Sequence, residues 1–216
     1  MKVIDKKKAP NIPKVSDFSI YKREFFQRDP VEVAIDLVGS ILVRTDPAGE
    51  QIIAAAKIVE VEAYRSDDPA CHTWRKGGEI PPKESRSFQL FGEPGKAYIY
   101  LNYGVHWLLN VIAHREGEAG AVLFRAVEPI LGLEFIKKNR PKIKKIHQLT
   151  DGPGKLTKAL AIDGKFNGKG LITPPLFLAK GKKPKKIAKS QRIGISKGKE
   201  LLWRFFIPQN PFLSKK

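Results

Sequence analysis

The sequence predicts an α+β fold: a single domain with a curved, largely antiparallel β-sheet, flanking helices and a protruding β-hairpin. Apolar and β-branched runs at residues 40–44, 51–64 and 121–127 are separated by turn residues, which is typical of strands. Residues 98–111 form two further alternating runs around Asn102-Tyr103-Gly104, and this pattern favours a hairpin. Helical periodicity is confined to short stretches, and no internal repeat or second domain boundary is visible.

Taken in order, the elements follow from local signals. Asp29, Pro30 and Glu32 mark a helix start, because Asp is a good cap, Pro suits the first turn and Glu completes a capping box. This helix should end at Gly39, and residues 46–49 should form the turn between the first two strands. Residues 65–95 predict a long loop. We also expect helices at 18–27, 132–139 and 156–162, and closing strands at 171–178, 191–195 and 202–207.

Composition sets the broad class. A chain of 216 residues with 42% hydrophobic and 29% charged residues can bury a core and is typical of a globular protein. The single cysteine, Cys71, excludes an internal disulfide framework and a cysteine-based zinc cluster. With no signal-peptide pattern and no apolar stretch of membrane-spanning length, we expect a cytoplasmic protein, associated with the nucleoid when it acts. We expect residues 1–16 to be a flexible basic arm and 17–216 to be one domain.

The net charge of +18 is unevenly distributed. Residues 137–216 hold 22 Lys and Arg against three acids, whereas residues 1–136 are close to neutral. Such an asymmetry favours a polyanionic partner, because neutralising phosphates releases counterions. The alternative is a solvated lysine-rich surface that serves solubility alone.

Two carboxylates lie in the strand predicted at 51–64. Alternation along the strand places Glu60, Glu62 and Tyr64 on one face. An ionised Glu62 could take a proton from water, and a neighbouring carboxylate would raise the pKa of this group. The alternative is a pair of exposed glutamates on the solvent face of the strand. The pattern therefore makes Glu62 the leading candidate for a catalytic base.

Aromatic residues accompany this pair. Tyr103, between Asn102 and Gly104 at the predicted hairpin tip, should protrude, and a protruding ring could fill the space vacated by a base drawn out of a duplex. Tyr64 and Tyr100 could stack on such a base, and His72 could donate a hydrogen bond to it. Packing within the protein is the alternative explanation for each of these rings.

The segment Asp151-Gly-Pro-Gly-Lys155 precedes helix-forming residues and resembles a phosphate grip at a helix start. It is not a Walker motif, because the earlier glycine is missing and Leu156 replaces Ser or Thr. A plain turn before a helix is the alternative.

These residues together resemble the alkyladenine (3-methyladenine) DNA glycosylase family, from about residue 18 to 213. The motifs that carry the resemblance are Val59-Glu-Val-Glu-Ala-Tyr64, Ala70-Cys-His72, Pro94-Gly-Lys-Ala-Tyr-Ile-Tyr100, Tyr103-Gly104, Asn110, Leu123-Phe-Arg-Ala-Val-Glu-Pro129 and Gly152-Pro-Gly-Lys-Leu156. The resemblance implies a monomeric, monofunctional repair enzyme that acts on double-stranded DNA without a cofactor. Water would release 3-methyladenine, 7-methylguanine and, in many relatives, hypoxanthine or ethenoadenine, and an abasic site would remain.

The resemblance also implies roles for individual residues. Glu62 would be the general base, Arg125 would lie near the water and the flipped nucleotide, and Tyr103 would intercalate. The walls of the base pocket would be Tyr64, His72, Tyr100 and Asn110, with Asn110 excluding guanine by a clash with its amino group. Gly152, Gly154 and Lys155 would contact DNA phosphate.

The chain departs from the family pattern in the loop after His72, where Glu84-Ser-Arg-Ser87 follows extra residues around 79–82. This difference concerns the selectivity of the pocket rather than the catalytic residues. Two other functions remain open at this point: a non-catalytic nucleic-acid binder that uses residues 137–216, and an RNA-directed hydrolase that uses the same carboxylates.

Overall fold

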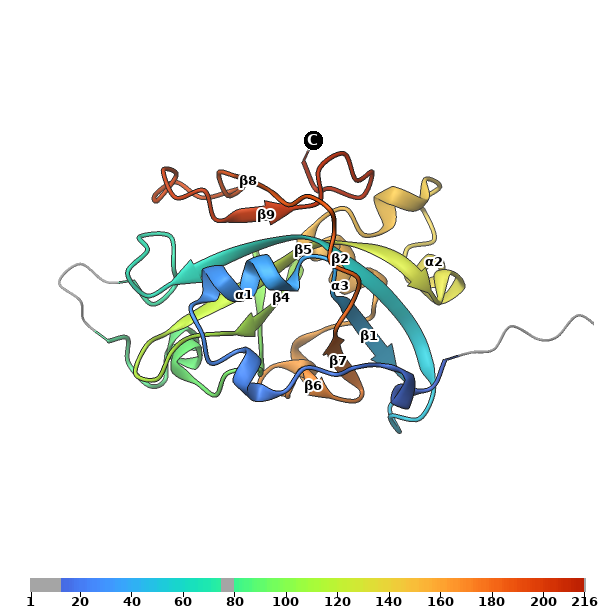
Figure 1. The fold of residues 1–216 in the computed structure, drawn as a ribbon, viewed down its shortest axis with the longest axis horizontal. Coiled ribbons are helices and arrows are strands. Elements are labelled where there is room, and N and C mark those ends of the chain that lie inside the picture. The colour runs from blue at the N-terminus through green and yellow to red at the C-terminus, as the bar shows by residue number, and fades with distance from the viewer. Residues whose placement is uncertain (1–12, 75–79, 216) are drawn as a thin grey trace, which may run out of the picture.

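In the computed structural model, which describes residues 13–74 and 80–215, one curled antiparallel sheet organises the chain (Figure 1). Its main strand order is β3-β4-β5-β2-β1-β7-β6, and β9 joins β2 and carries β8. The strands are β1 (Ile41–Thr45), β2 (Ile52–Arg65), β3 (Ala97–Asn102), β4 (His106–Ile112), β5 (Gly120–Leu131), β6 (Ile172–Thr173), β7 (Leu176–Ala179), β8 (Ala188–Ser190) and β9 (Arg204–Phe206). The predicted α+β class and curved antiparallel sheet are confirmed.

The long strands β2 and β5 form the centre of the sheet. Their register shifts on both sides of Glu60: Glu60 pairs with Ala126, whereas Glu62 pairs with Leu123. Such irregularities bend a strand and increase its twist. At the same place β9 pairs along β2, with Arg204 opposite Glu62. The bend therefore lies at the segment that carries both glutamates.

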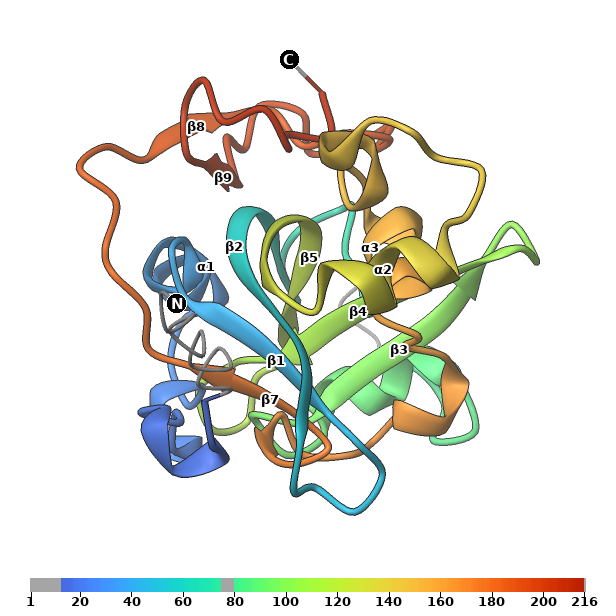
Figure 2. The ribbon, with the colours of Figure 1, turned by 90° about the vertical axis from the view of Figure 1, so that its right-hand side faces the viewer.

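Short helices cover the sheet: α1 (Pro30–Leu37), α2 (Leu133–Asn139) and α3 (Pro153–Ala159). The cap predicted for α1 is present, because Asp29 Oδ1 accepts the Val31 N–H at 2.8 Å and Pro30 opens the helix. The hairpin of β3 and β4 extends away from the body of the molecule, and β4 lies beside α3 (Figure 2). No helix within residues 13–74 and 80–215 is long and apolar enough to cross a membrane.

The helix predicted at 18–27 is wrong. A short 3-10 turn, Arg23–Phe25, lies within this range, and another, Val15–Asp17, precedes it. The Tyr21 N–H donates to the Leu178 carbonyl at 3.0 Å, and Ile20 forms a bridge with Ala179. Pairing with the edge of β7 thus takes the backbone groups that a helix would have used, and tertiary context overrides helix propensity.

Two closing strands also differ from the prediction. The strand predicted at 171–178 is divided at Pro174 and Pro175 into β6 and β7, because proline has no N–H for the ladder. The strand predicted at 191–195 is wrong, because β8 ends at Ser190. Beyond it, the Arg192 side chain donates to the Ala63 carbonyl, and the Ile193 N–H donates to the Glu62 side chain. Of the predicted arm at 1–16, all but residues 13–16 lies outside the described residues.

Candidate active site

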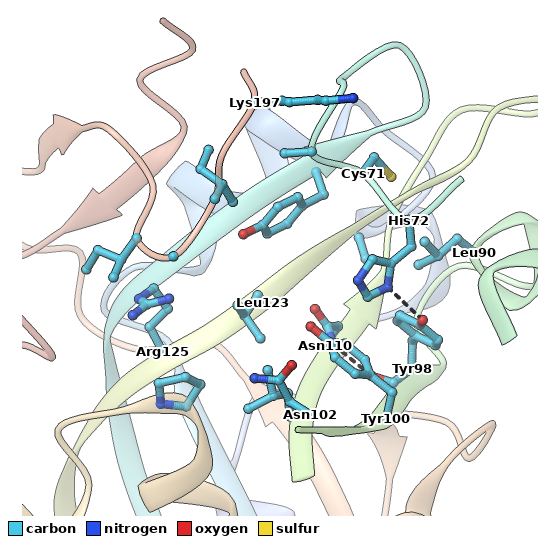
Figure 3. Close-up of a pocket in the computed structure, with 18 of the residues that line it drawn as sticks. Cys71, His72, Leu90, Tyr98, Tyr100, Asn102, Asn110, Leu123, Arg125 and Lys197 are labelled. Atoms are coloured by element: carbon cyan, nitrogen blue, oxygen red, sulfur yellow. Dashed lines mark hydrogen bonds between the residues drawn. The ribbon is translucent and has the colours of Figure 1, made fainter. Parts of the chain in front are cut away.

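A cavity of about 470 Å³ opens between the hairpin, the middle of β2 and β5, and two loops. Ligand pockets are commonly of this size. Its walls come from parts of the chain that are far apart in sequence, represented by Tyr64, His72, Tyr100, Asn110, Arg125 and Ile193. Figure 3 shows Arg125 on one side of the space and His72, Tyr98 and Tyr100 on the other. The four residues predicted as pocket walls, Tyr64, His72, Tyr100 and Asn110, are therefore brought together.

Aromatic rings in contact form one wall. The His72 ring centroid lies 4.8 Å from that of Tyr100, and Tyr98 lies 5.3 Å from Tyr100. His72 Nδ1 is hydrogen-bonded to the Tyr98 hydroxyl at 3.0 Å (Figure 3). Burial raises the pKa of Tyr100 to about 12, so its hydroxyl stays protonated at neutral pH. This wall offers neutral ring surface to a flat ligand.

Asn110 is held at the same side of the cavity by its own backbone neighbourhood. Its side chain is buried, and Nδ2 donates to the Tyr98 carbonyl at 3.0 Å. Because β3 and β4 pair Tyr98 with Asn110, this bond fixes the plane of the amide. A fixed polar group of this kind can discriminate between ligands by what it clashes with.

Glu62 lies directly behind the cavity wall. Both Glu60 and Glu62 have side chains with 0% exposure, so the alternative of two exposed glutamates is wrong. Glu62 Oε2 accepts the Tyr64 hydroxyl at 2.8 Å and Arg125 Nη1 at 3.2 Å, and Oε1 accepts the Ile193 N–H at 2.7 Å. All three donors belong to residues that line the cavity.

Burial raises the pKa of the Glu62 carboxyl, because the ionised form is poorly solvated there. Three groups lower the pKa of Glu62: Arg125, the Ile193 N–H and the Tyr64 hydroxyl. Glu60 raises this pKa and is the last of the causes. The predicted direction of the shift is therefore confirmed, but desolvation rather than the neighbouring carboxylate is its main cause.

Sequence patterns missed the residues that surround this pair. Arg204 and Ser214 bond to Glu60, and Arg192 forms a buried ion pair with Asp68. The Arg192 guanidinium also lies 4.7 Å from the centre of the Tyr64 ring. The sequence did contain one indication of a buried Arg204, because this arginine is the one charged residue within the apolar segment 201–207. Arg192 and Arg204 are buried, so these two basic residues of the C-terminal third do not belong to its charged surface.

Tyr103 lies at the tip of the β3–β4 hairpin, where its side chain is 89% exposed. Its backbone has φ of 49°, a left-handed conformation that is uncommon for residues other than glycine. Tyr103 also contributes to the rim of the cavity together with Asn102. The predicted protrusion is confirmed.

The Gly152-Pro-Gly-Lys155 segment begins α3 beside the hairpin. Lys155 Nζ donates to Asp151 Oδ1 at 2.9 Å and remains half exposed. A Cβ at Gly154 would lie 2.9 Å from Cβ of His106, so this glycine lets β4 approach the helix closely. The segment thus has a packing role beside the turn of the hairpin, and phosphate contact by Gly152, Gly154 and Lys155 stays a prediction.

Comparison with known proteins places the chain in a family. The family model for methylpurine-DNA glycosylase matches residues 24–211. A protein of Salinibacter ruber is 47% identical over 88% of this chain and 94% of its own length. Proteins of Carboxydothermus hydrogenoformans and Bradyrhizobium diazoefficiens are 43% and 41% identical over 90% of this chain, and over 98% and 90% of their own lengths. All three carry the provisional name 3-methyladenine DNA glycosylase.

A match over nearly the whole chain favours the enzyme over the non-catalytic binder, and it agrees with a buried carboxylate behind an aromatic cavity. The chain therefore belongs to the methylpurine-DNA glycosylase family, and it is a DNA glycosylase.

Proposed function

We propose that this enzyme draws alkylated purines out of duplex DNA and hydrolyses their N-glycosidic bond with a water activated by Glu62, leaving an abasic site. Its main substrates are 3-methyladenine and 7-methylguanine, and hypoxanthine and ethenoadenine form a more demanding second group. The position of Glu62, buried and joined to three residues of an aromatic-walled cavity, carries this proposal.

Base flipping is supported by the shape of the site. A target base inside a duplex cannot enter an enclosed cavity unless it leaves the stack, which requires a few kcal/mol. Tyr103, exposed at the cavity rim at the tip of the hairpin, could occupy the vacated position in the duplex. The flipped base would then stack on the tyrosine and histidine rings.

Water activation follows from the unfilled bonding capacity of Glu62. A carboxylate offers about four lone-pair directions, and the Tyr64, Arg125 and Ile193 donors use three of them. We infer that the attacking water takes the remaining direction on Oε1. Because the Glu62 side chain has 0% exposure, that water enters only when the cavity wall shifts as the nucleotide binds.

The leaving group decides how much help the reaction needs. A 3-methyladenine or 7-methylguanine base is cationic while attached to the sugar, so it departs without further protonation. Aromatic rings attract a cation held over their faces, which favours these lesions in a pocket walled by Tyr64 and Tyr100. Neutral hypoxanthine lacks this attraction and must gain a proton, so we expect its release to be slower.

Double-stranded DNA is the partner that the charge distribution favours. Lys155 and the glycines beside it lie next to the hairpin, and Lys197 lines the cavity, so both lysines can meet phosphate near a flipped nucleotide. Phosphate contacts draw the enzyme to DNA of any sequence. Recognition of the lesion then depends on the cavity.

Release of free base from methylated duplex DNA, followed by chromatography, tests the proposal. The wild type should release 3-methyladenine, and Glu62→Gln should lower the rate by about 10²–10⁴-fold, the usual contribution of a general base. The Gln variant keeps an acceptor oxygen and should still bind lesion-containing duplex. Release by Glu62→Gln at the wild-type rate would refute the role of Glu62.

A parallel assay addresses the RNA-directed alternative. RNA oligonucleotides with the same methylated bases should be processed more slowly than duplex DNA. Faster release of the bases from RNA than from duplex DNA would instead support an RNA-directed hydrolase that uses the same carboxylate.

A further inference from the structure

We propose that residues 212–215 form part of the catalytic centre. Through Ser214, and together with Arg204, these residues hold the Glu60 side chain in place. Glu60 in turn holds the Arg125 guanidinium against Glu62. This inference rests on the proposed function only in naming Glu62 as the base. Glu60, Arg204 and Ser214 act through Arg125, so they are positioning residues.

Glu60 accepts four hydrogen bonds from two arginines and the C-terminal segment. Its Oε1 accepts Arg204 Nε at 2.7 Å, Arg125 Nε at 3.0 Å and Ser214 Oγ at 2.7 Å. Its Oε2 accepts the Ser214 backbone N–H at 2.6 Å. Three of these bonds meet Oε1 and one meets Oε2. Among these donors only Arg125 lines the cavity, whereas all three donors to Glu62 do, and this separates the role of Glu60 from that of Glu62.

Arg125 connects the two carboxylates. Its Nε bonds to Glu60 at 3.0 Å, its Nη1 bonds to Glu62 at 3.2 Å, and its Nη2 bonds to Ser214 Oγ at 3.2 Å. A guanidinium is planar and its N–H directions are fixed relative to one another. Anchoring its Nε edge on Glu60 and Ser214 therefore sets the direction in which Nη1 meets Glu62.

The end of the chain is itself held firmly. Phe212 and Leu213 are buried in a small apolar cluster with Val59 and Ala126, the residues beside Glu60 and Arg125 in their strands. Arg204 Nη2 donates to the Lys215 carbonyl at 2.9 Å. Both views place the C-terminal segment above the middle of β2 and β5 (Figures 1 and 2). The segment thus covers a buried ion cluster that would otherwise meet water.

Ser214→Ala tests the inference, because it removes the hydroxyl that Glu60 and Arg125 share but keeps the backbone N–H. Single-turnover base release should fall about tenfold or more, the effect of losing one hydrogen bond to a charged group. The Kd for lesion-containing duplex should change by less than about threefold, because the aromatic wall of the cavity and the hairpin are untouched. Ser214→Thr, which restores a hydroxyl, should recover most of the rate, and exposed Ser19→Ala serves as the control.

An NMR measurement decides the point without activity. The Arg125 Nε–H signal, assigned with Arg125→Lys, should be protected from exchange in the wild type and Ser214→Thr but not in Ser214→Ala. The inference would be overturned if Ser214→Ala kept the wild-type rate and an unchanged Nε–H signal. It would also be overturned if Ser214→Ala lost rate, DNA affinity and melting temperature together and Ser214→Thr restored none of them. If the wild type released no base, the proposed function would fail and the NMR result alone would decide whether the tail holds Arg125.

Discussion

The Tyr64 hydroxyl donates to Glu62 Oε2 at 2.8 Å, so one residue both lines the cavity and binds the carboxylate behind it. The bond stabilises the ionised form of Glu62 and lowers its pKa, against the larger effect of burial. In turn, burial and the nearby Glu62 charge raise the pKa of Tyr64 well above its usual value, so the donor keeps its proton. Tyr64 therefore connects the lining of the cavity to the ionisation of Glu62.

Tyr64→Phe separates the two roles of this residue. The variant keeps the ring but removes a donor to Glu62, so the pKa of Glu62 should rise further. We expect single-turnover release at pH 6 to fall by about tenfold, with a smaller loss at pH 8. Affinity for lesion-containing duplex should be nearly unchanged. An equal loss of rate at both pH values would show that the hydroxyl has no influence on the ionisation of Glu62.

The raised pKa of Glu62 predicts the pH dependence of catalysis. The base must be ionised, so the rate should rise with pH through a midpoint above the ordinary glutamate value of about 4.3. Stability should change in the opposite direction, because the folded state binds this proton more tightly than the unfolded state does. Relative to Glu62→Gln, the wild type should therefore lose stability as pH rises through the folded pKa. Melting temperatures of both proteins from pH 4 to 9 check this; a constant difference would contradict it.

Tyr103→Gly should weaken DNA recognition without harming the fold. The side chain is 89% exposed and the backbone is left-handed, a conformation that glycine adopts more easily. We expect the unfolding free energy to be unchanged or higher, while binding of lesion-containing duplex weakens by about 1–3 kcal/mol, the value of one stacked ring. Tyr103→Phe, which keeps the ring, should behave like the wild type. A drop in melting temperature with normal binding would instead give Tyr103 a structural role.

The loops on one side of the cavity depend on a buried ion pair between Asp68 and Arg192. Arg192 Nη2 donates to Asp68 Oδ1 at 2.8 Å and to the Gly198 carbonyl at 3.2 Å. Removing one partner by Asp68→Ala should destabilise the protein by about 3–5 kcal/mol, because the other charge stays buried. Chemical denaturation measures this, with exposed Asp67→Ala as the matched control. Equal stability of the two variants would argue against the ion pair as a stabilising contact.

Gly154 and His106 provide a test of the segment that opens α3. A Cβ at Gly154 would crowd His106, so Gly154→Ala should weaken lesion binding by displacing the hairpin. The double variant with His106→Gly should recover that loss, because it removes the His106 Cβ that a Cβ at position 154 would meet at 2.9 Å. If Gly154 instead serves phosphate only, the double variant should bind no better than the single one.

Lys155→Gln tests the phosphate contact predicted for this residue. The variant should lower the slope of log K for DNA binding against log salt concentration by about 1.

The sequence alone determined the local elements with strong chemical signals. The Asp29-Pro30 start fixed α1, because a cap and a proline at the first turn have few other uses. Asn102 to Gly104 placed the hairpin turn, and period-two alternation put Glu62 and Tyr64 on one face. The resemblance in ordered motifs then named residues that the structure brings around one cavity.

Tertiary structure decided what depends on partners distant in the chain. Residues 18–27 do not form the predicted helix, because part of their backbone bonds to the edge of β7. Residues 191–195 are not a strand, because Ile193 bonds to Glu62 and Arg192 bonds to Asp68. The different bonding partners of Glu60 and Glu62 could not be predicted from the sequence either, because both residues occupy the same position in the alternating pattern of the strand. Ser214 lies 154 residues from Glu60, and a contact at that separation exists only once the strands are packed. Bonding to such distant segments, rather than spacing along the strand, makes Glu60 an anchor for Arg125 and joins Glu62 to residues that line the cavity.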